Sequence, residues 1–156
     1  MERTLTLLKP DAVQRQLVGR IIERFESKGL KIVAMKFLRV TPEMAANLYS
    51  MHQGKEFYPA LMRFITSGPV VAMVLQGLDA VRIARTLMGS TFGPDAAPGT
   101  IRGDLGASRR YNLMHGSDSM DAAAREIPIF FPENELIEYD MSIESWIYAR
   151  HGRKHL

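Results

Sequence analysis

Residues 70–75 (VVAMVL) form an unbroken apolar run, and no other segment limits the possible folds of this chain as strongly. A short run without polar alternation is typical of a strand that is buried on both faces of a sheet. Gly68-Pro69 directly precedes the run and separates it from the segment before it. We therefore expect this strand in the middle of a sheet that is covered on both sides.

The rest of the pattern alternates strands with helices. Residues 3–8 alternate Thr and Leu, residues 30–40 are rich in β-branched and apolar side chains, and residues 111–115 are predicted as a further short strand. Helices are predicted over residues 18–25 with Gly29 as C-cap, from Thr41 as N-cap with Pro42 next, over residues 57–65, over residues 79–88 closed by Gly89, and from residues 117–119 to about Glu126. This alternation predicts an α/β sandwich around one sheet, and the length suits a single domain over residues 1–156.

Residues 90–110 show neither a helical nor a strand period and contain several Gly and Pro residues. A loop of about twenty residues inside a compact domain is uncommon and is usually functional or disordered. Residues 137–147 are predicted to form short irregular structure. The long loop is the first place at which function is expected.

Composition excludes several classes of protein. The chain is 46% hydrophobic and 24% charged, which is normal for a globular protein and unlike a disordered one. It has no cysteine, so disulfides and thiol chemistry are excluded, and its four histidines show no metal-ligand spacing. No apolar run has the length of a membrane helix and no secretory signal is present, so we expect a cytoplasmic protein without a membrane partner.

A formal net charge of +3 indicates anionic partners only weakly. Part of this excess lies in the tail at residues 150–155 (RHGRKH), which we expect to be solvated rather than to act as an arm for nucleic acid.

Residues 112–119 (NLMHGSDS) carry the strongest chemical signal. His115 ends a predicted strand, Gly116 allows close approach of the backbone, and a predicted helix begins after residues 117–119. A helix N-terminus attracts phosphate and disfavours a charged imidazole, so a neutral and nucleophilic ring is expected. The alternative is a hydrogen-bonded turn histidine beside an ordinary helix cap.

The pattern N-x-x-H-G-S-D-S resembles the active-site signature of the nucleoside diphosphate kinases. Other segments resemble the same family in the same order along the chain: residues 4–11 (TLTLLKPD), residues 17–19 (LVG), residues 24–26 (RFE), residues 28–29 (KG), residues 67–71 (SGPVV), residues 98–104 (PGTIRGD) and residues 146–148 (WIY). The resemblance therefore covers nearly the whole chain, and chance does not account for it.

This resemblance implies a fold and an activity. The fold is a ferredoxin-like, four-stranded antiparallel sheet covered by helices, with a long loop at the nucleotide site. The activity is a ping-pong transfer of the γ-phosphoryl group from ATP or another nucleoside triphosphate to a nucleoside diphosphate, with broad tolerance of base and sugar. Mg²⁺ would accompany the nucleotide, and the protein would be a homo-oligomer, either a hexamer or a tetramer. Phosphoryl transfer needs positioning and cations more than other chemistry, which suits a site of this composition.

The resemblance also implies the site residues. The phosphohistidine would form on the pros nitrogen of His115, with Glu126 and Ser117 orienting the ring and with Lys9 and Tyr49 nearby. Nucleotide contacts are implied for Lys9, His52, Phe57, Leu61, Arg85, Thr91, Arg102, Asn112 and Gly116, and Asp118 would meet the metal through water.

Several of these residues have ordinary alternatives. Phe57 would stack on the base, but Phe57 and Leu61 are also four apart, as core residues on one helix face would be. Arg82 lies close to the same face as Arg85, and only the resemblance selects Arg85. Arg102 is expected to bind phosphate in a bidentate way, and Asn112 to contact the ribose or, alternatively, to bond a strand edge. The spacing alone does not show that Glu126 reaches His115.

Two segments depart from the family pattern. Residues 91–95 (TFGPD) move the usual proline by one position, and residues 108–111 (SRRY) place Arg109 where many members carry an apolar residue beside the base. These changes leave oligomer type and nucleotide preference open.

Two other functions are alternatives to phosphoryl transfer. An inactive, nucleotide-binding relative is disfavoured because every catalytic position matches. A nucleic-acid-binding protein is suggested only by the positive charge, and no basic stripe interleaved with aromatics supports it as the main role. The sequence also contains no P-loop motif and no protein-kinase signature.

Overall fold

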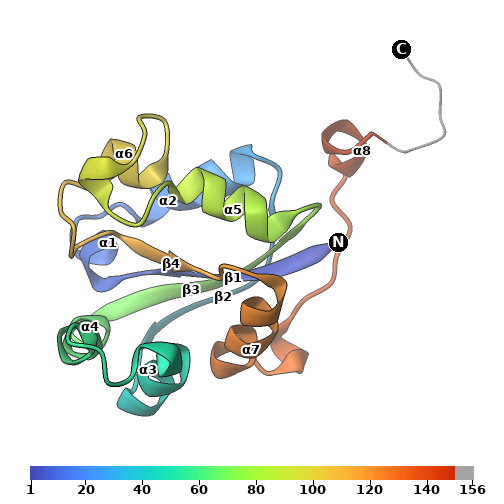
Figure 1. Ribbon diagram of the computed structural model, residues 1–156. Helices are drawn as coiled ribbons and strands as arrows, with labels where there is room; N and C mark the ends of the chain where they lie inside the picture. The colour runs from blue at the N-terminus through green and yellow to red at the C-terminus, as the bar shows by residue number, and fades with distance from the viewer. Residues whose placement is uncertain (150–156) are drawn as a thin grey trace.

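The computed structural model describes residues 1–149, which form one four-stranded antiparallel sheet with helices on both faces (Figure 1). The strands are β1 (Glu2–Leu8), β2 (Lys31–Arg39), β3 (Pro69–Gly77) and β4 (Met114–Gly116), in the order β2-β3-β1-β4. The ferredoxin-like sheet is therefore confirmed. The apolar run lies in β3, an inner strand, as its composition predicts.

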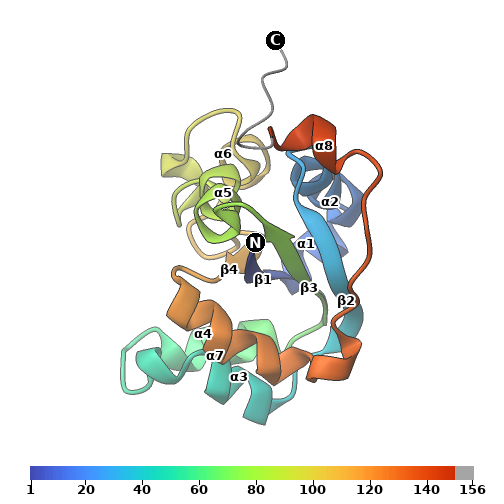
Figure 2. The same ribbon diagram turned by 90° about the vertical axis from the view of Figure 1, so that its right-hand side faces the viewer.

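Two helical layers cover the sheet. One layer contains α1 (Pro10–Gln14), α2 (Val18–Ser27), α5 (Ala80–Met88) and α6 (Ile101–Leu105). The other contains α3 (Pro42–Leu48), α4 (Tyr58–Ile65) and α7 (Met120–Phe130), and Figures 1 and 2 show the two layers on opposite sides of the strands. Short 3₁₀ turns occur at η1 (Ser50–His52), η2 (Gly93–Asp95) and η3 (Glu133–Glu135), and a last helical turn, α8, spans Glu144–Ile147.

The period of two along each strand divides the apolar side chains between two cores. Leu5 and Leu7 of β1 pack with residues of α3, α4 and α7, whereas Leu8 packs with residues of α2 and α5. His115 of β4 pairs directly with Leu7 and Met114 pairs with Leu8. Since residues that face each other across a strand pair share a side of the sheet, His115 lies on the side of α3, α4 and α7.

The predicted helix signals hold in the structure. The Thr41 hydroxyl accepts a hydrogen bond from the Met44 amide at 3.1 Å, and Pro42 begins α3. Gly89 ends α5 with φ 83°, a conformation that favours glycine. Ser119 is the N-cap of α7, whose eleven residues extend past the predicted end at Glu126 to Phe130.

Two predictions about irregular segments need correction. Residues 90–110 are not a loop throughout, because they contain η2 and α6. Both elements are too short to show a sequence period. The Thr100 hydroxyl begins α6 by accepting from the Gly103 amide at 3.0 Å. Residues 137–147 likewise include the single turn α8.

The predicted strand at residues 111–115 is wrong in its first half. Strand β4 contains only Met114–Gly116, since Leu113 has φ 71° and turns the chain before it. In the described part of the chain, no helix has the length and apolar character needed to cross a membrane. The prediction about the basic tail concerns residues that lie outside the described range.

Candidate active site

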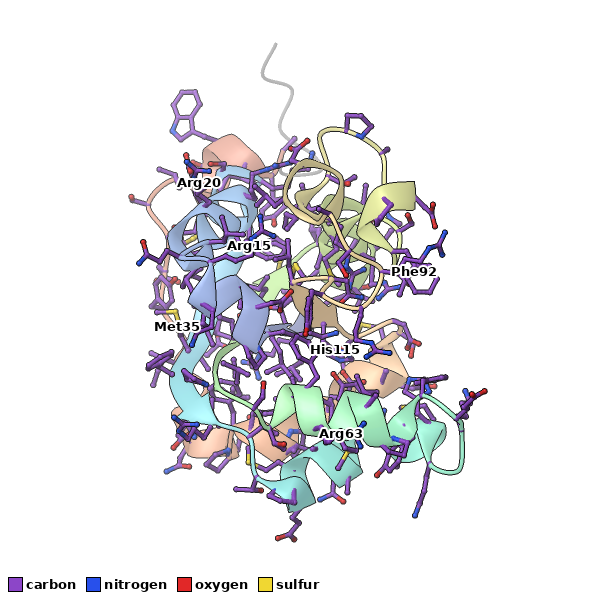
Figure 3. All side chains as sticks on the ribbon, turned by 90° about the vertical axis from the view of Figure 1, so that its left-hand side faces the viewer. Arg15, Arg20, Met35, Arg63, Phe92 and His115 are labelled. Atoms are coloured by element: carbon purple, nitrogen blue, oxygen red, sulfur yellow. The ribbon has the colours of Figure 1, made fainter. Side chains whose placement is uncertain are left out.

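A cavity of about 610 Å³ opens beside His115. With the exception of Ser117, all of the site residues expected from the sequence line it: Lys9, Tyr49, His52, Phe57, Leu61, Arg85, Thr91, Arg102, Asn112, His115, Gly116, Asp118 and Glu126. They lie just after β1 and α3, in or next to α4, α5, α6, β4 and α7, and in the long loop. Figure 3 shows His115 above α4 and Phe92 near the edge of the molecule on the same side. Segments that are distant in the sequence thus share one hollow.

The His115 ring is held at one nitrogen and open at the other. Its Nε2 lies 2.9 Å from Oε2 of Glu126, and the Ser117 hydroxyl donates to the same oxygen at 2.8 Å. A carboxylate only accepts hydrogen bonds, so in the neutral ring Nε2 carries the hydrogen and Nδ1 has the lone pair. The side chain is 19% exposed, whereas that of Glu126 is 3% exposed. The ring is therefore oriented from behind with Nδ1 as its free nucleophilic atom.

Glu126 remains ionised in this position. Burial raises its pKa, but the hydrogen bond and charge of His115, the Ser117 hydroxyl and the charge of Arg125 together lower the pKa below its usual value. Helix α7 packs against β1, which brings Glu126 back to the strand that carries His115. The structure thus forms a contact that the spacing could not establish.

Aromatic rings continue from His115 toward the cavity mouth. Tyr49 meets His115 edge to face, with centroids 5.9 Å apart, and stacks on His52 at 6.0 Å. His52 in turn contacts the ring of Phe57 at 5.2 Å. Tyr49 is buried with no hydrogen-bond partner for its hydroxyl, and burial raises its pKa, so it is present as the phenol. Burial also lowers the pKa of His52, with smaller effects from Lys55 and His115.

Lys9 and Asn112 form a buried pair. The Lys9 ammonium donates to Oδ1 of Asn112 at 2.8 Å, and Nδ2 of Asn112 donates to the Thr91 carbonyl at 2.8 Å. Burial and the nearby charge of Arg102 lower the pKa of Lys9 to about 8. Lys9 is therefore still mainly charged at neutral pH, but it is far easier to neutralise than an exposed lysine. Asn112 is not a strand-edge residue, since β4 begins after it.

Arg102 is buried and anchored to the backbone. Its Nε, Nη1 and Nη2 donate to the carbonyls of Asn112, Gly89 and Met114 at 3.0, 3.2 and 2.6 Å. A guanidinium has five N–H donors, so two remain for a ligand. Burial and the charge of Arg85 lower the pKa of Arg102 to about 10. The bidentate phosphate contact expected for Arg102 would use these two remaining N–H groups, one on each terminal nitrogen, and it stays a prediction.

Of the two arginines on α5, only Arg85 lines the cavity. Its Nη1 donates to the Gly116 carbonyl at 3.4 Å. Arg82 is exposed and forms an ion pair with Asp79 at 2.7 Å. The two positions are three residues apart on nearly the same face of α5, and both line the neighbouring hollow, but only Arg85 also reaches the cavity beside His115.

The outer end of the cavity is apolar and aromatic. Phe57 is half exposed there, beside Leu61 and Phe64 of α4, and Phe92 and Arg109 line the same cavity from the long loop. Sequence analysis missed Phe64, although the spacing 57, 61, 64 marks one helix face. It also missed Met51, Ala60, Arg110 and Met114 as lining residues.

The unusual loop residues form a cluster of their own. The Arg109 guanidinium lies 5.0 Å from the centroid of the Phe92 ring and forms an ion pair with Asp95 at 3.0 Å. Across the mouth, Tyr111 contacts Phe64 of α4, with centroids 5.1 Å apart. Both departures from the family pattern thus lie at the outer end of the cavity rather than beside His115.

Asp118 is an exposed carboxylate at the rim of this cavity. It also borders a neighbouring open hollow that shares Arg85 with it. Within residues 1–149, no cluster of three or more His, Cys, Asp or Glu side chains could hold a metal ion. A divalent ion at this rim would therefore take most of its ligands from a bound anionic molecule.

Comparison with known proteins gives a consistent result. A sequence profile described as nucleoside diphosphate kinase matches residues 2–136. A nucleoside diphosphate kinase of Thermoplasma volcanium is 57% identical over 139 residues, which cover 89% of this chain and 95% of that protein. One from Archaeoglobus fulgidus is 53% identical over 148 residues, covering 95% and 98%. Among solved structures, a halophilic nucleoside diphosphate kinase from Halobacterium salinarum in complex with CDP has a TM-score of 0.92 at 52% identity, covering 94% of this chain and 98% of that one.

Proposed function

This chain belongs to the nucleoside diphosphate kinase family, and we propose that His115 is the residue through which it passes the phosphoryl group. The activity itself is transfer of the γ-phosphoryl group of a nucleoside triphosphate to a nucleoside diphosphate. The proposal for His115 rests on one observation above all: Nε2 is bound to a buried carboxylate, while Nδ1 is left free in a ring that lines the cavity.

In the first half-reaction, the lone pair on Nδ1 attacks the γ-phosphorus. A nitrogen–phosphorus bond forms, the bond from phosphorus to the bridging oxygen breaks, and the diphosphate leaves with that electron pair. The ring keeps its hydrogen at Nε2 and so gains positive charge, which the ionised Glu126 stabilises at 2.9 Å. Ser117 keeps the carboxylate oxygen in place from behind. The second half-reaction is the reverse, with a different diphosphate as acceptor.

Cations at the inner end of the cavity suit the phosphate chain. Arg85, Lys9 and the two unused N–H groups of Arg102 are proposed to neutralise charge on the phosphoryl oxygens in the transition state. Their partners in the protein hold each side chain before the nucleotide arrives, so little ordering is needed on binding. Tyr49, Thr91, Gly116 and Asn112 are proposed to complete this end, with Asn112 and Lys9 near the sugar.

The aromatic end of the cavity is proposed to hold the base. Phe57 offers the face of a ring, with Leu61 and His52 beside it. Stacking on a ring face tolerates any base, because every base has such a face. This agrees with an enzyme that serves many nucleosides. The Halobacterium relative that was solved with CDP shows the same class of ligand in a similar fold.

We propose that Mg²⁺ is held mainly by the nucleotide phosphates, with Asp118 as a water-mediated contact. The single exposed carboxylate at the rim fits this, since it can orient a hydrated ion without stripping its waters. When bound, the ion would neutralise part of the phosphate charge.

We also propose that the protein is a single domain over residues 1–156, a cytoplasmic homo-oligomer, and a hexamer or tetramer. Strand β2 lies at the edge of the sheet, where its first half bonds to residues 137–139 through the Val33 and Ile32 carbonyls, and Met35 and Phe37 are exposed on its second half. Exposed apolar side chains on an edge strand are typical of a contact surface. Membrane and nucleic-acid partners are not part of the proposal.

The test of His115 is direct. The protein is incubated with γ-labelled ATP, the acid-labile label on the chain is measured, and GDP is then added. We expect labelling followed by transfer to GDP, and we expect His115→Ala to abolish both. His52→Ala is the matched control, because it removes a second imidazole from the same cavity and should leave the acid-labile label in place. Acid-labile label that survives His115→Ala would refute the assignment.

A further inference from the structure

The three residues before His115 form an unusual turn. Leu113 has φ 71°, and across it the Met114 amide donates to the Asn112 carbonyl at 2.8 Å. A three-residue turn with this hydrogen bond and a positive φ at its centre is the rare and strained form of the γ-turn. Leucine has a Cβ and strongly disfavours this region of backbone conformation. Something outside the turn must therefore hold it.

Asp11 and Lys9 hold the central residue on both sides. Oδ2 of Asp11 accepts from the Leu113 amide at 2.9 Å, and the Lys9 amide donates to the Leu113 carbonyl at 2.8 Å. The Leu113 side chain is fully buried in the core on the side of α2 and α5. Neither polar atom of this residue is left unpaired, and its side chain cannot move to solvent.

Arg102 holds the two ends of the same turn. Its Nε donates to the Asn112 carbonyl and its Nη2 donates to the Met114 carbonyl. The Arg102 guanidinium thus hydrogen-bonds to both ends of the turn, and the Asp11 carboxylate hydrogen-bonds to its centre. The two charged groups also attract each other, since Asp11 is among the charges that act on Arg102.

The turn decides where two site residues point. Before it, Asn112 binds Lys9 and the Thr91 carbonyl; after it, His115 binds Glu126. Both residues line the same cavity although they are three positions apart on a chain that would otherwise run straight as a strand. In an extended strand, side chains three positions apart point to opposite faces. The reversal at Leu113 therefore lets Asn112 and His115 share one ligand.

We infer that Asp11 is a positioning residue for phosphoryl transfer, because its carboxylate hydrogen bond keeps Leu113 in the turn that sets Asn112 and His115 toward one cavity. Asp11 does not line that cavity itself. It acts through the backbone, and the hydrogen bond that it accepts from Leu113 matters more to this role than its attraction for Arg102 and Lys9. This inference rests on the proposed role of His115.

The test compares Asp11→Ala with Asp11→Asn in single-turnover phosphorylation of His115 by labelled ATP. Asn keeps an acceptor oxygen in nearly the same place, whereas Ala removes it. We expect Asp11→Ala to slow phosphorylation about tenfold or more, since small misplacements of reacting groups have effects of this order. Asp11→Asn should stay within about threefold of the unmodified protein, because it keeps the hydrogen bond.

Two controls separate positioning from general stability. Thr41→Ala removes the exposed N-cap of α3, away from the cavity, and should lower the thermal midpoint without slowing phosphorylation. Hydrogen exchange of the Leu113 amide should become faster in Asp11→Ala and stay slow in Asp11→Asn. If Asp11→Ala does not fold, Asp11→Glu replaces it, since one added methylene moves the acceptor while keeping the charge, and it should also slow the reaction.

Two results would overturn the inference: phosphorylation by Asp11→Ala at the rate of the unmodified protein, or Asp11→Asn as slow as Asp11→Ala. Failure of the proposed function would look different. In that case the unmodified protein itself would carry no acid-labile label, while the exchange of the Leu113 amide would still report whether Asp11 holds the turn.

Discussion

The pKa values of Lys9 and Glu126 depend on burial and on the partners that the fold brings to them. Lys9 lies in a strand-to-helix turn, where a lysine is usually exposed, yet it is buried against Asn112 and near Arg102. Glu126 is buried too, but its partners His115 and Ser117 keep it ionised. One environment thus makes a cation easier to neutralise, while the other keeps an anion charged beside the reacting ring.

The lowered pKa of Lys9 predicts a pH dependence. A lysine whose pKa in the folded protein is about 8 is charged below that pH and loses its charge as the pH rises through it. We expect kcat/KM for ATP to fall above about pH 8, approaching about tenfold per pH unit, since this ratio reports groups of the free enzyme. The measurement is a profile of kcat/KM between about pH 6.5 and pH 9.5.

The matched variant for this profile is Lys9→Arg, whose side chain stays charged over the whole range. We expect a lower activity, because the larger guanidinium does not place its charge where the lysine ammonium lies. The decline of kcat/KM above about pH 8 should nevertheless disappear. A decline of the same size in Lys9→Arg would show that another group causes it.

At the scale of elements, the cavity is built from two different kinds of wall. Helix α4 presents Phe57, Leu61 and Phe64 at helical spacing, a regular pattern that follows from its sequence. The opposite wall is the long loop, whose shape depends on η2, α6 and contacts such as the ion pair between Arg109 and Asp95. The regular wall follows from local periodicity, and the irregular wall carries the residues, such as Arg109, that depart from the family pattern expected from the sequence.

Arg109 at the outer end should therefore affect binding and not chemistry. We expect Arg109→Val to raise KM for purine nucleotides about two- to tenfold, since a cation over a ring face contributes on the order of 1 kcal/mol. The kcat should stay unchanged, because neither His115 nor Glu126 contacts Arg109. Steady-state kinetics with GDP and CDP as acceptors would measure both quantities.

Arg82→Val serves as the control for this variant, since it removes the same charge from an exposed position outside the cavity. A KM that is unchanged in Arg109→Val, or that rises equally in Arg82→Val, would argue against contact of Arg109 with the nucleotide.

The whole molecule buries its sheet on both faces but leaves part of β2 open. Met35 and Phe37 alternate with half-buried residues along this edge strand, on the side that α2 covers only in part. Figure 3 shows Met35 at the side of the molecule away from Phe92, so this surface is separate from the cavity mouth. Exposed apolar side chains on an edge strand are unfavourable in a monomer and are buried when subunits pack against it.

This surface predicts the outcome of one substitution. Phe37→Lys should shift the protein toward smaller assemblies, because a charge on an apolar contact surface is costly to bury. Light scattering after size-exclusion chromatography measures the mass directly. Leu78→Lys places the same new charge at another exposed apolar position and should leave the mass unchanged. Equal masses for Phe37→Lys and the unmodified protein would move the subunit contact elsewhere.

The sequence by itself determined most of the helices and strands, and its resemblance to a known family supplied the candidate site residues. The apolar run of β3, the Thr41 cap and the terminating Gly89 depend on neighbours in the chain, so local rules identify them. Of the motif around His115, the residues Asn112, His115, Gly116 and Asp118 line one cavity, and Ser117 contacts Glu126 beside it. Local rules failed where no period exists, as in the short helices within residues 90–110 and in the turn at Leu113.

Only the tertiary structure decided how those residues act on one another. Glu126 reaches His115 because α7 packs back along β1, Arg102 is occupied by three carbonyls, and Asp11 holds a turn 102 positions further along the chain. These contacts join segments that are close only after the sheet and both helical layers have formed. Their geometry follows from packing between distant segments, which no pattern of neighbouring residues can express.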